Sequence, residues 1–73
     1  MNSTDVKEIC KQIIAEANAV IGYTDSIDNS KSKALKATFA EDMKDEVSHL
    51  QKLVVALTEV IDGKEPTIAE KMD

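Results

Sequence analysis

Two long stretches of apolar residues spaced three or four positions apart constrain this fold most strongly. The first series is Val6, Ile9, Cys10, Ile13, Ile14, Ala17, Val20 and Ile21, and the second is Leu35, Phe39, Met43, Leu50, Leu53, Val54, Leu57, Val60 and Ile61. This spacing follows one face of an α-helix and not the alternation of a strand. Residues 28–32, Asp-Asn-Ser-Lys-Ser, separate the two series and are of the types that turns prefer. The pattern therefore predicts an all-α chain with a helix over 5–27, a turn over 28–32 and a helix over 32–62.

The end of the second helix is also marked in the sequence. Gly63 can adopt the left-handed conformation that closes a helix, and Pro66 cannot continue one. We expect residues 1–73 to form a single domain whose C-terminal tail adds a short helix over 66–72.

The predicted antiparallel hairpin is too small to be stable by itself. A chain of 73 residues buries only about 60% of the surface that its unfolded form exposes, and the single cysteine, Cys10, rules out an internal disulfide. We interpret Cys10 as a small core residue. Two hairpins packed together would bury both apolar stripes in a four-helix bundle. We therefore expect a homodimer, or a larger assembly built from dimers.

Three ionisable residues interrupt the apolar stripes. On the first helix Ile13, Glu16 and Val20 follow the inward spacing, so Glu16 occupies an apolar position. On the second, Glu46 lies between Met43 and Leu50, and His49 follows one turn later on the same face. Burying a carboxylate is unfavourable unless it is paired. A bound cation would supply that pairing.

The position of the turn also predicts how these residues meet. Residues equidistant from the turn of a hairpin lie level with each other because both helices rise equally per residue. Glu16 and Glu46 are 30 residues apart, and their midpoint is residue 31, inside the predicted turn. The two carboxylates should therefore face each other across the hairpin.

Two Glu and one His form half of the ligand set of a dinuclear metal site. Such a site holds two first-row metal ions with bridging and terminal carboxylates and one imidazole for each ion. The segment Glu46-Val47-Ser48-His49 is a Glu-x-x-His pair, which brings both ligand types to one helical face. A two-fold dimer would complete the set to four Glu and two His.

With Glu16, Tyr23 seven residues later and the Glu-x-x-His pair, the chain resembles the rubrerythrin and ferritin-like superfamily. The matching segments are 15–23, Ala-Glu-Ala-Asn-Ala-Val-Ile-Gly-Tyr, and 45–50, Asp-Glu-Val-Ser-His-Leu. The resemblance covers about residues 8–62 and is greatest to the short, two-helix branch, the encapsulated-ferritin type. In that branch a dimer of helical hairpins builds the di-iron bundle.

This resemblance implies the chemistry of the site. Glu16, Glu46 and His49 would be iron ligands, and Tyr23 would lie beside a di-iron centre. The implied activity is oxidation of ferrous iron by dioxygen or peroxide, as in a ferroxidase or peroxidase. These 73 residues contain no Cys-x-x-Cys pair, so we expect no rubredoxin module of the kind found in rubrerythrin.

Several alternatives remain open from the residues. Asp42, one turn before Glu46, either guides incoming cations or belongs to a solvated acidic face. Glu16 and Glu46 could lie at the edge of their stripes, and His49 could be a partly buried histidine bonded to a neighbour. The same ligands could hold zinc, manganese or calcium without turnover. The hairpin could instead be a protein-interaction module.

Composition argues against other classes of partner. The net charge is −5 and aromatic residues make up 3% of the chain, so we expect no nucleic-acid binding. No apolar run is long enough for a membrane span, and residues 1–5 lack the features of a secretory signal. We expect a cytoplasmic protein, either free or inside a protein compartment.

Overall fold

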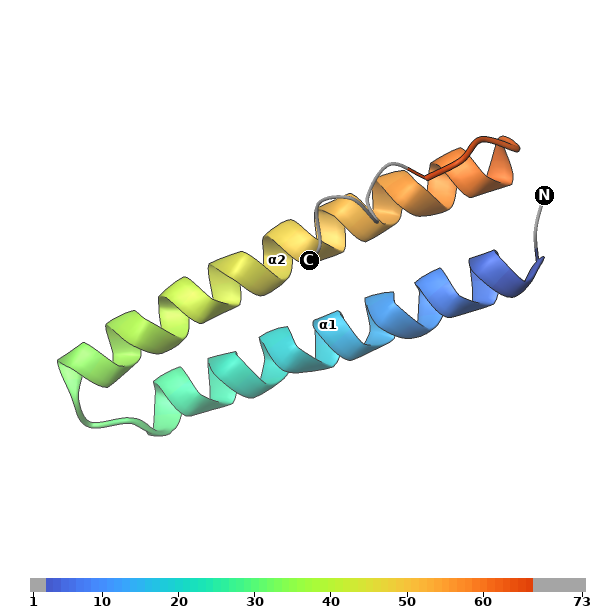
Figure 1. The fold of residues 1–73 in the computed structure, drawn as a ribbon. Coiled ribbons are helices and arrows are strands. Elements are labelled where there is room, and N and C mark those ends of the chain that lie inside the picture. Colours follow the sequence, from blue (N-terminus) through green and yellow to red (C-terminus); the bar gives the residue numbers. More distant parts are fainter. Residues whose placement is uncertain (1–2, 67–73) are drawn as a thin grey trace.

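A computed structural model describes residues 3–66 and contains two antiparallel helices (Figure 1). Helix α1 spans Ser3–Asn29 and helix α2 spans Lys33–Ile61. The all-α helical hairpin is therefore confirmed. The helices differ by one or two residues at each end from the predicted 5–27 and 32–62. Asp5 lies in the first turn of α1, where its carboxylate interacts favourably with the positive end of the helix dipole.

The turn between the helices is short and capped by serine. Ser32 has an extended backbone, and its side-chain oxygen accepts a hydrogen bond from the Leu35 amide at 3.2 Å. This N-cap satisfies one of the amides that the first turn of a helix leaves unpaired. Because the connection is so short, α2 begins beside the end of α1 and returns along it (Figure 1).

The end of α2 is closed at Gly63, as the sequence predicted. Gly63 has a positive φ of 79°. Its amide donates to the Val60 carbonyl at 3.0 Å, and the Lys64 amide donates to the Glu59 carbonyl at 2.8 Å. These two bonds define a Schellman motif, which turns the chain out of the helix. Most of the expected short helix over 66–72 lies outside the described residues.

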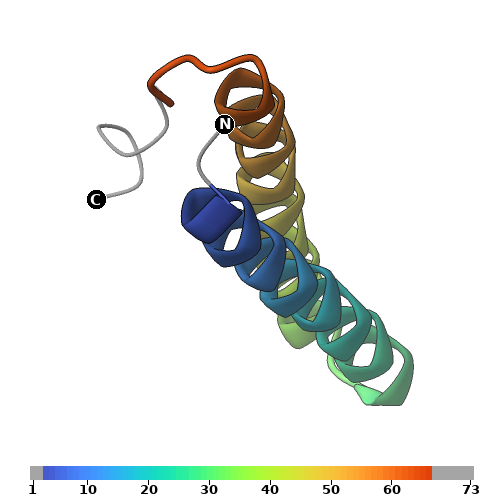
Figure 2. The same cartoon turned by 90° about the vertical axis from the view of Figure 1, so that its right-hand side faces the viewer.

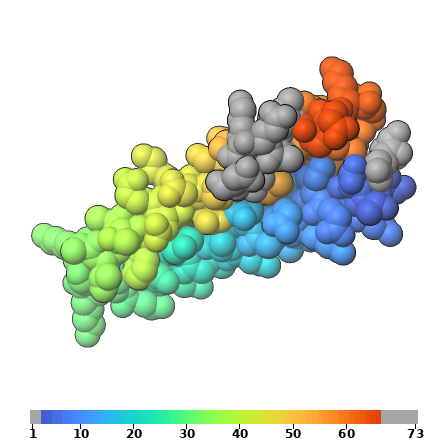
Figure 3. Space-filling model, in the orientation of Figure 1, coloured from blue at the N-terminus to red at the C-terminus, as the bar shows by residue number. Residues whose placement is uncertain are grey.

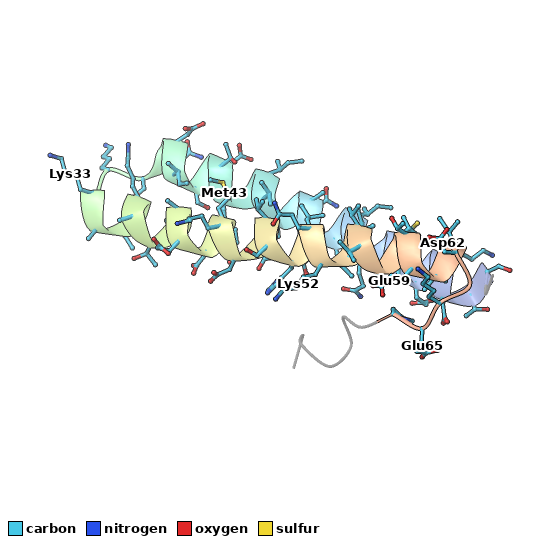
Figure 4. The ribbon with its side chains drawn as sticks, turned by 90° about the horizontal axis from the view of Figure 1, so that it is seen from above. Lys33, Met43, Lys52, Glu59, Asp62 and Glu65 are labelled. Carbon is cyan, nitrogen blue, oxygen red and sulfur yellow. The ribbon has the colours of Figure 1, made fainter. Side chains whose placement is uncertain are left out.

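Side chains from both helices meet along the line where α1 and α2 touch, here called the seam. Near the turn, the Tyr23 and Phe39 rings pack at a centroid distance of 6.5 Å and an interplanar angle of 34°. Beside them, the Thr24 hydroxyl lies 3.5 Å from the Met43 sulfur, and Met43 points toward α1 in Figure 4. Figure 2, turned by 90° from Figure 1, also shows the two helices running next to each other.

The seam buries few residues completely. Among residues 3–66 the buried apolar residues are Leu53, Ala56 and Val60, all on α2, and α1 has none. Several large apolar side chains are exposed instead, namely Ile14, Ile21, Leu35, Val47, Val54, Val55 and Ile61. The space-filling view in Figure 3 shows a narrow rod. A hairpin of this kind leaves apolar surface in water that a larger assembly could cover.

Within residues 3–66, neither helix has a sufficiently long and apolar stretch to cross a membrane.

Candidate metal centre

Glu16 on α1 and both Glu46 and His49 on α2 converge halfway along the hairpin. One ligand atom from each residue can be chosen so that all three lie within 4.8 Å of one another. The turn at residues 30–32 makes this possible, because it sets Glu16 and Glu46 at the same height. The predicted facing of the two carboxylates is therefore present in the fold.

The imidazole of His49 lies between the two carboxylates. Its Nδ1 atom is 3.5 Å from Glu16 Oε2 and 3.9 Å from Glu46 Oε2. The contact with Glu46 follows from their separation of three residues on one helix. The contact with Glu16 crosses the seam and depends on how the helices pack. Together the three side chains form one cluster, here called the ligand cluster.

One atom of this cluster is buried without a hydrogen bond. Glu16 Oε2 is buried and accepts no hydrogen bond from the described residues. Its distance of 3.5 Å to His49 Nδ1 is longer than a well-formed N–H···O bond. A buried carboxylate oxygen without a partner is unfavourable by about 1–3 kcal/mol, more when it is charged. A cation is one partner that would remove this penalty.

The spacing of the ligand atoms is compatible with a shared metal ion. Transition metals bind carboxylate oxygen and imidazole nitrogen at about 2.0–2.2 Å, so two ligands of one ion lie at most about 4.4 Å apart. The two distances from His49 Nδ1, 3.5 and 3.9 Å, fall within this limit, and the two carboxylates offer oxygens within 4.8 Å of each other. The donor set of two carboxylates and one imidazole suits iron, zinc or manganese. The cluster is thus chemically fit to hold a transition-metal ion, with positions left for further ligands.

The ligand cluster is covered unevenly. The side chains of Glu16 and Glu46 retain 18% and 22% of their exposure, whereas that of His49 retains 40%. Both carboxylates therefore point mainly into the hairpin and not into solvent. The more exposed His49 marks the side on which a further ligand, or a second protein molecule, could reach the cluster.

Two other residues named from the sequence lie near the ligand cluster but outside it. Tyr23 is half-buried against Phe39, about 10 Å along α1 from Glu16 by the rise of the helix. Asp42 is half-buried one turn before Glu46. The roles of Tyr23 beside the metals and of Asp42 in guiding cations stay predictions. Cys10 is a half-buried free thiol.

Within residues 3–66, the converging group consists of the three residues that the sequence pattern indicated. The feature that sequence reasoning did not identify is the bridging position of His49. Its contact with Glu46 follows from spacing, but its closer approach to Glu16 depends on the rotation of α2 against α1. The available signal was the spacing of three residues, which rotates His49 by about 60° around the α2 axis from Glu46.

Comparisons with known proteins leave the family open. No protein-family model, no curated protein and no solved structure matches the chain significantly.

Proposed function

We propose that this chain is a ferritin-like di-iron carboxylate protein that binds iron through Glu16, Glu46 and His49 and oxidises it from the ferrous to the ferric state. The observation that carries the proposal is the convergence of two largely covered carboxylates and one imidazole within 4.8 Å. The unpartnered Oε2 atom of Glu16 supports it, because a cation would stabilise that atom.

Each chain would contribute half of a dinuclear site. A second copy approaching on the His49 side would complete the ligand set to four carboxylates and two imidazoles. The 40% exposure of the His49 side chain is consistent with this approach, because a fully enclosed cluster would leave no room for the partner's ligands. Two ions shared by two chains correspond to about one iron per chain.

The proposed reaction is balanced with iron as the reductant. Two ferrous ions each lose one electron, and dioxygen takes up the two electrons with two protons to give hydrogen peroxide. With hydrogen peroxide as oxidant, the two electrons and two protons yield two water molecules. The protein's part is to hold both ions in one place with negatively charged oxygen ligands, which favour the ferric state.

Metal analysis of iron-loaded protein tests the binding step. We expect about one iron per chain in the native protein and none in His49→Ala or Glu46→Ala, because each removes a third of the ligands that a chain supplies. Glu41→Ala is the matched control, since Glu41 is an exposed carboxylate on α2 outside the cluster. Unchanged iron content in both ligand variants would contradict the proposal.

The oxidation step needs its own measurement. Ferric absorbance is followed after ferrous iron is added to the protein in air, with buffer alone as the reference. We expect the native protein to accelerate oxidation and the His49→Ala variant to match buffer. Iron binding with no acceleration would favour the alternative, a metal-binding bundle without turnover.

A further inference from the structure

A second surface of the hairpin stands apart from the ligand cluster. It contains the exposed side chains Ile14 and Ile21 of α1 and Val47, Val54 and Ile61 of α2, here called the apolar face. Their exposures are 61%, 60%, 40%, 51% and 52% in that order. The residues on each helix are seven apart, so they recur on one face of that helix.

The five residues lie on one side of the hairpin. At about 100° per residue, Ile21 and Ile14 are rotated about 140° and 160° from Glu16 on α1. Val47, Val54 and Ile61 are rotated about 100°, 80° and 60° from Glu46 on α2, in the same sense. Because the helices are antiparallel, rotation in the same sense leads to the same side of the hairpin. The contact between Thr24 and Met43 confirms this geometry, since both are rotated in that sense and they touch at 3.5 Å.

The ligand cluster opens on the other side. His49 is rotated about 60° from Glu46 in the opposite sense, so it lies about 160° from Val47 around α2. A partner that covers the apolar face would therefore leave His49 open. Conversely, a partner that shares the ligand cluster would leave much of the apolar face in water.

We propose that the apolar face binds a second copy of this chain, in a contact that requires no metal and differs from the one that would share the ligand cluster. The hairpin alone buries only three apolar residues completely among those described, so covering the face would add apolar burial that the single chain lacks. A second copy is always available for this purpose. Both helices carry the seven-residue repeat, so the surface can pack against itself around a two-fold axis.

Charges at the turn support a second copy as the occupant. Asp28 is exposed near the end of α1, and Lys33 and Lys36 are exposed near the start of α2, and all three are rotated toward the side of the apolar face. A two-fold axis parallel to the helices places α1 of one copy over α2 of the other at the same height. The acidic end of α1 in each copy then lies level with the basic start of α2 in the other copy. Attraction between these opposite charges favours the dimer.

The test measures the mass of metal-free protein in solution by sedimentation equilibrium with a chelator present. We expect the native chain to be a dimer and the double variant Val47→Glu with Val54→Glu to dissociate at least 100-fold more readily. Val55→Glu is the matched control, because Val55 is 57% exposed but lies on the opposite side of α2 from the seam. Helix content measured by circular dichroism verifies that each variant still folds.

Two further variants keep the test decisive. Asp28→Lys should weaken the dimer several-fold, and adding Lys36→Asp should restore it, without disturbing any apolar residue. His49→Ala should leave the metal-free dimer unchanged, which separates this proposal from the proposed function. A monomeric native chain, a Val55→Glu effect equal to that of the double variant, or dimers that persist in the double variant would overturn the inference.

Discussion

Two levels of the same seam differ in what fills them. Toward the open end of the hairpin, Leu53, Ala56 and Val60 are 4%, 0% and 4% exposed. Halfway along, the seam holds Glu16, Glu46 and His49, which are partly covered and incompletely bonded. The apolar level supplies burial, the main force that favours folding. The ligand cluster supplies little of it, as the proposed role in binding a cation would lead us to expect.

The largest predicted effect falls on the apolar level. Leu53→Ala should lower the free energy of unfolding by about 2–5 kcal/mol, because it removes buried methyl groups and leaves a cavity. Urea unfolding followed by circular dichroism measures the change. Val55→Ala, at an exposed position on the same helix, should change it by less than about 0.5 kcal/mol. Equal losses in the two variants would remove the distinction between seam and surface.

Metal should make the ligand cluster stabilising. A metal ion at a free concentration 100 times its dissociation constant stabilises the folded state by about 2.7 kcal/mol. We expect ferrous iron under anaerobic conditions, or zinc, to raise the unfolding midpoint of the native chain and not that of His49→Ala. A midpoint that rises equally in both proteins would place the metal elsewhere.

Without metal, the ligand cluster should be neutral or unfavourable for folding. Glu16→Leu replaces a carboxylate that includes a buried unpaired oxygen with an apolar side chain of similar size. We expect the free energy of unfolding of the metal-free protein to rise by about 1 kcal/mol. Glu41→Leu, at an exposed position, is the control for the helix-forming tendency of leucine. A loss of stability specific to Glu16→Leu would show that the carboxylate holds the seam together.

The smallest predicted effect concerns the hydroxyl of Tyr23, which lies between the ligand cluster and the turn. Tyr23→Phe keeps the ring that packs on Phe39, so the free energy of unfolding should change by less than about 0.5 kcal/mol. Iron content should also be unchanged. Stopped-flow absorbance then reports the oxidation rate, and a rate altered without loss of iron would assign the Tyr23 hydroxyl to the chemistry of the ligand cluster.

The sequence predicted the hairpin and the height of the ligand cluster because both depend on local rules. Helical spacing, a polar break and a fixed rise per residue place Glu16 opposite Glu46. Helix ends were less predictable, because several residues near each end can cap a helix. The division of the apolar residues was also not predictable. Ile13 and Ile14 both fit a helical stripe, but only the packed structure leaves Ile14 61% exposed.

The ligands are divided unequally between the helices, with one on α1 and two on α2. An ion held by all three would join the helices midway, far from the covalent link at residues 30–32. Separation of the helices would then require release of the ion. Opening of the hairpin at its free end would therefore be coupled to opening near the turn. Amide hydrogen exchange near residues 16 and 46 should slow on metal loading, whereas exchange at the turn should change little.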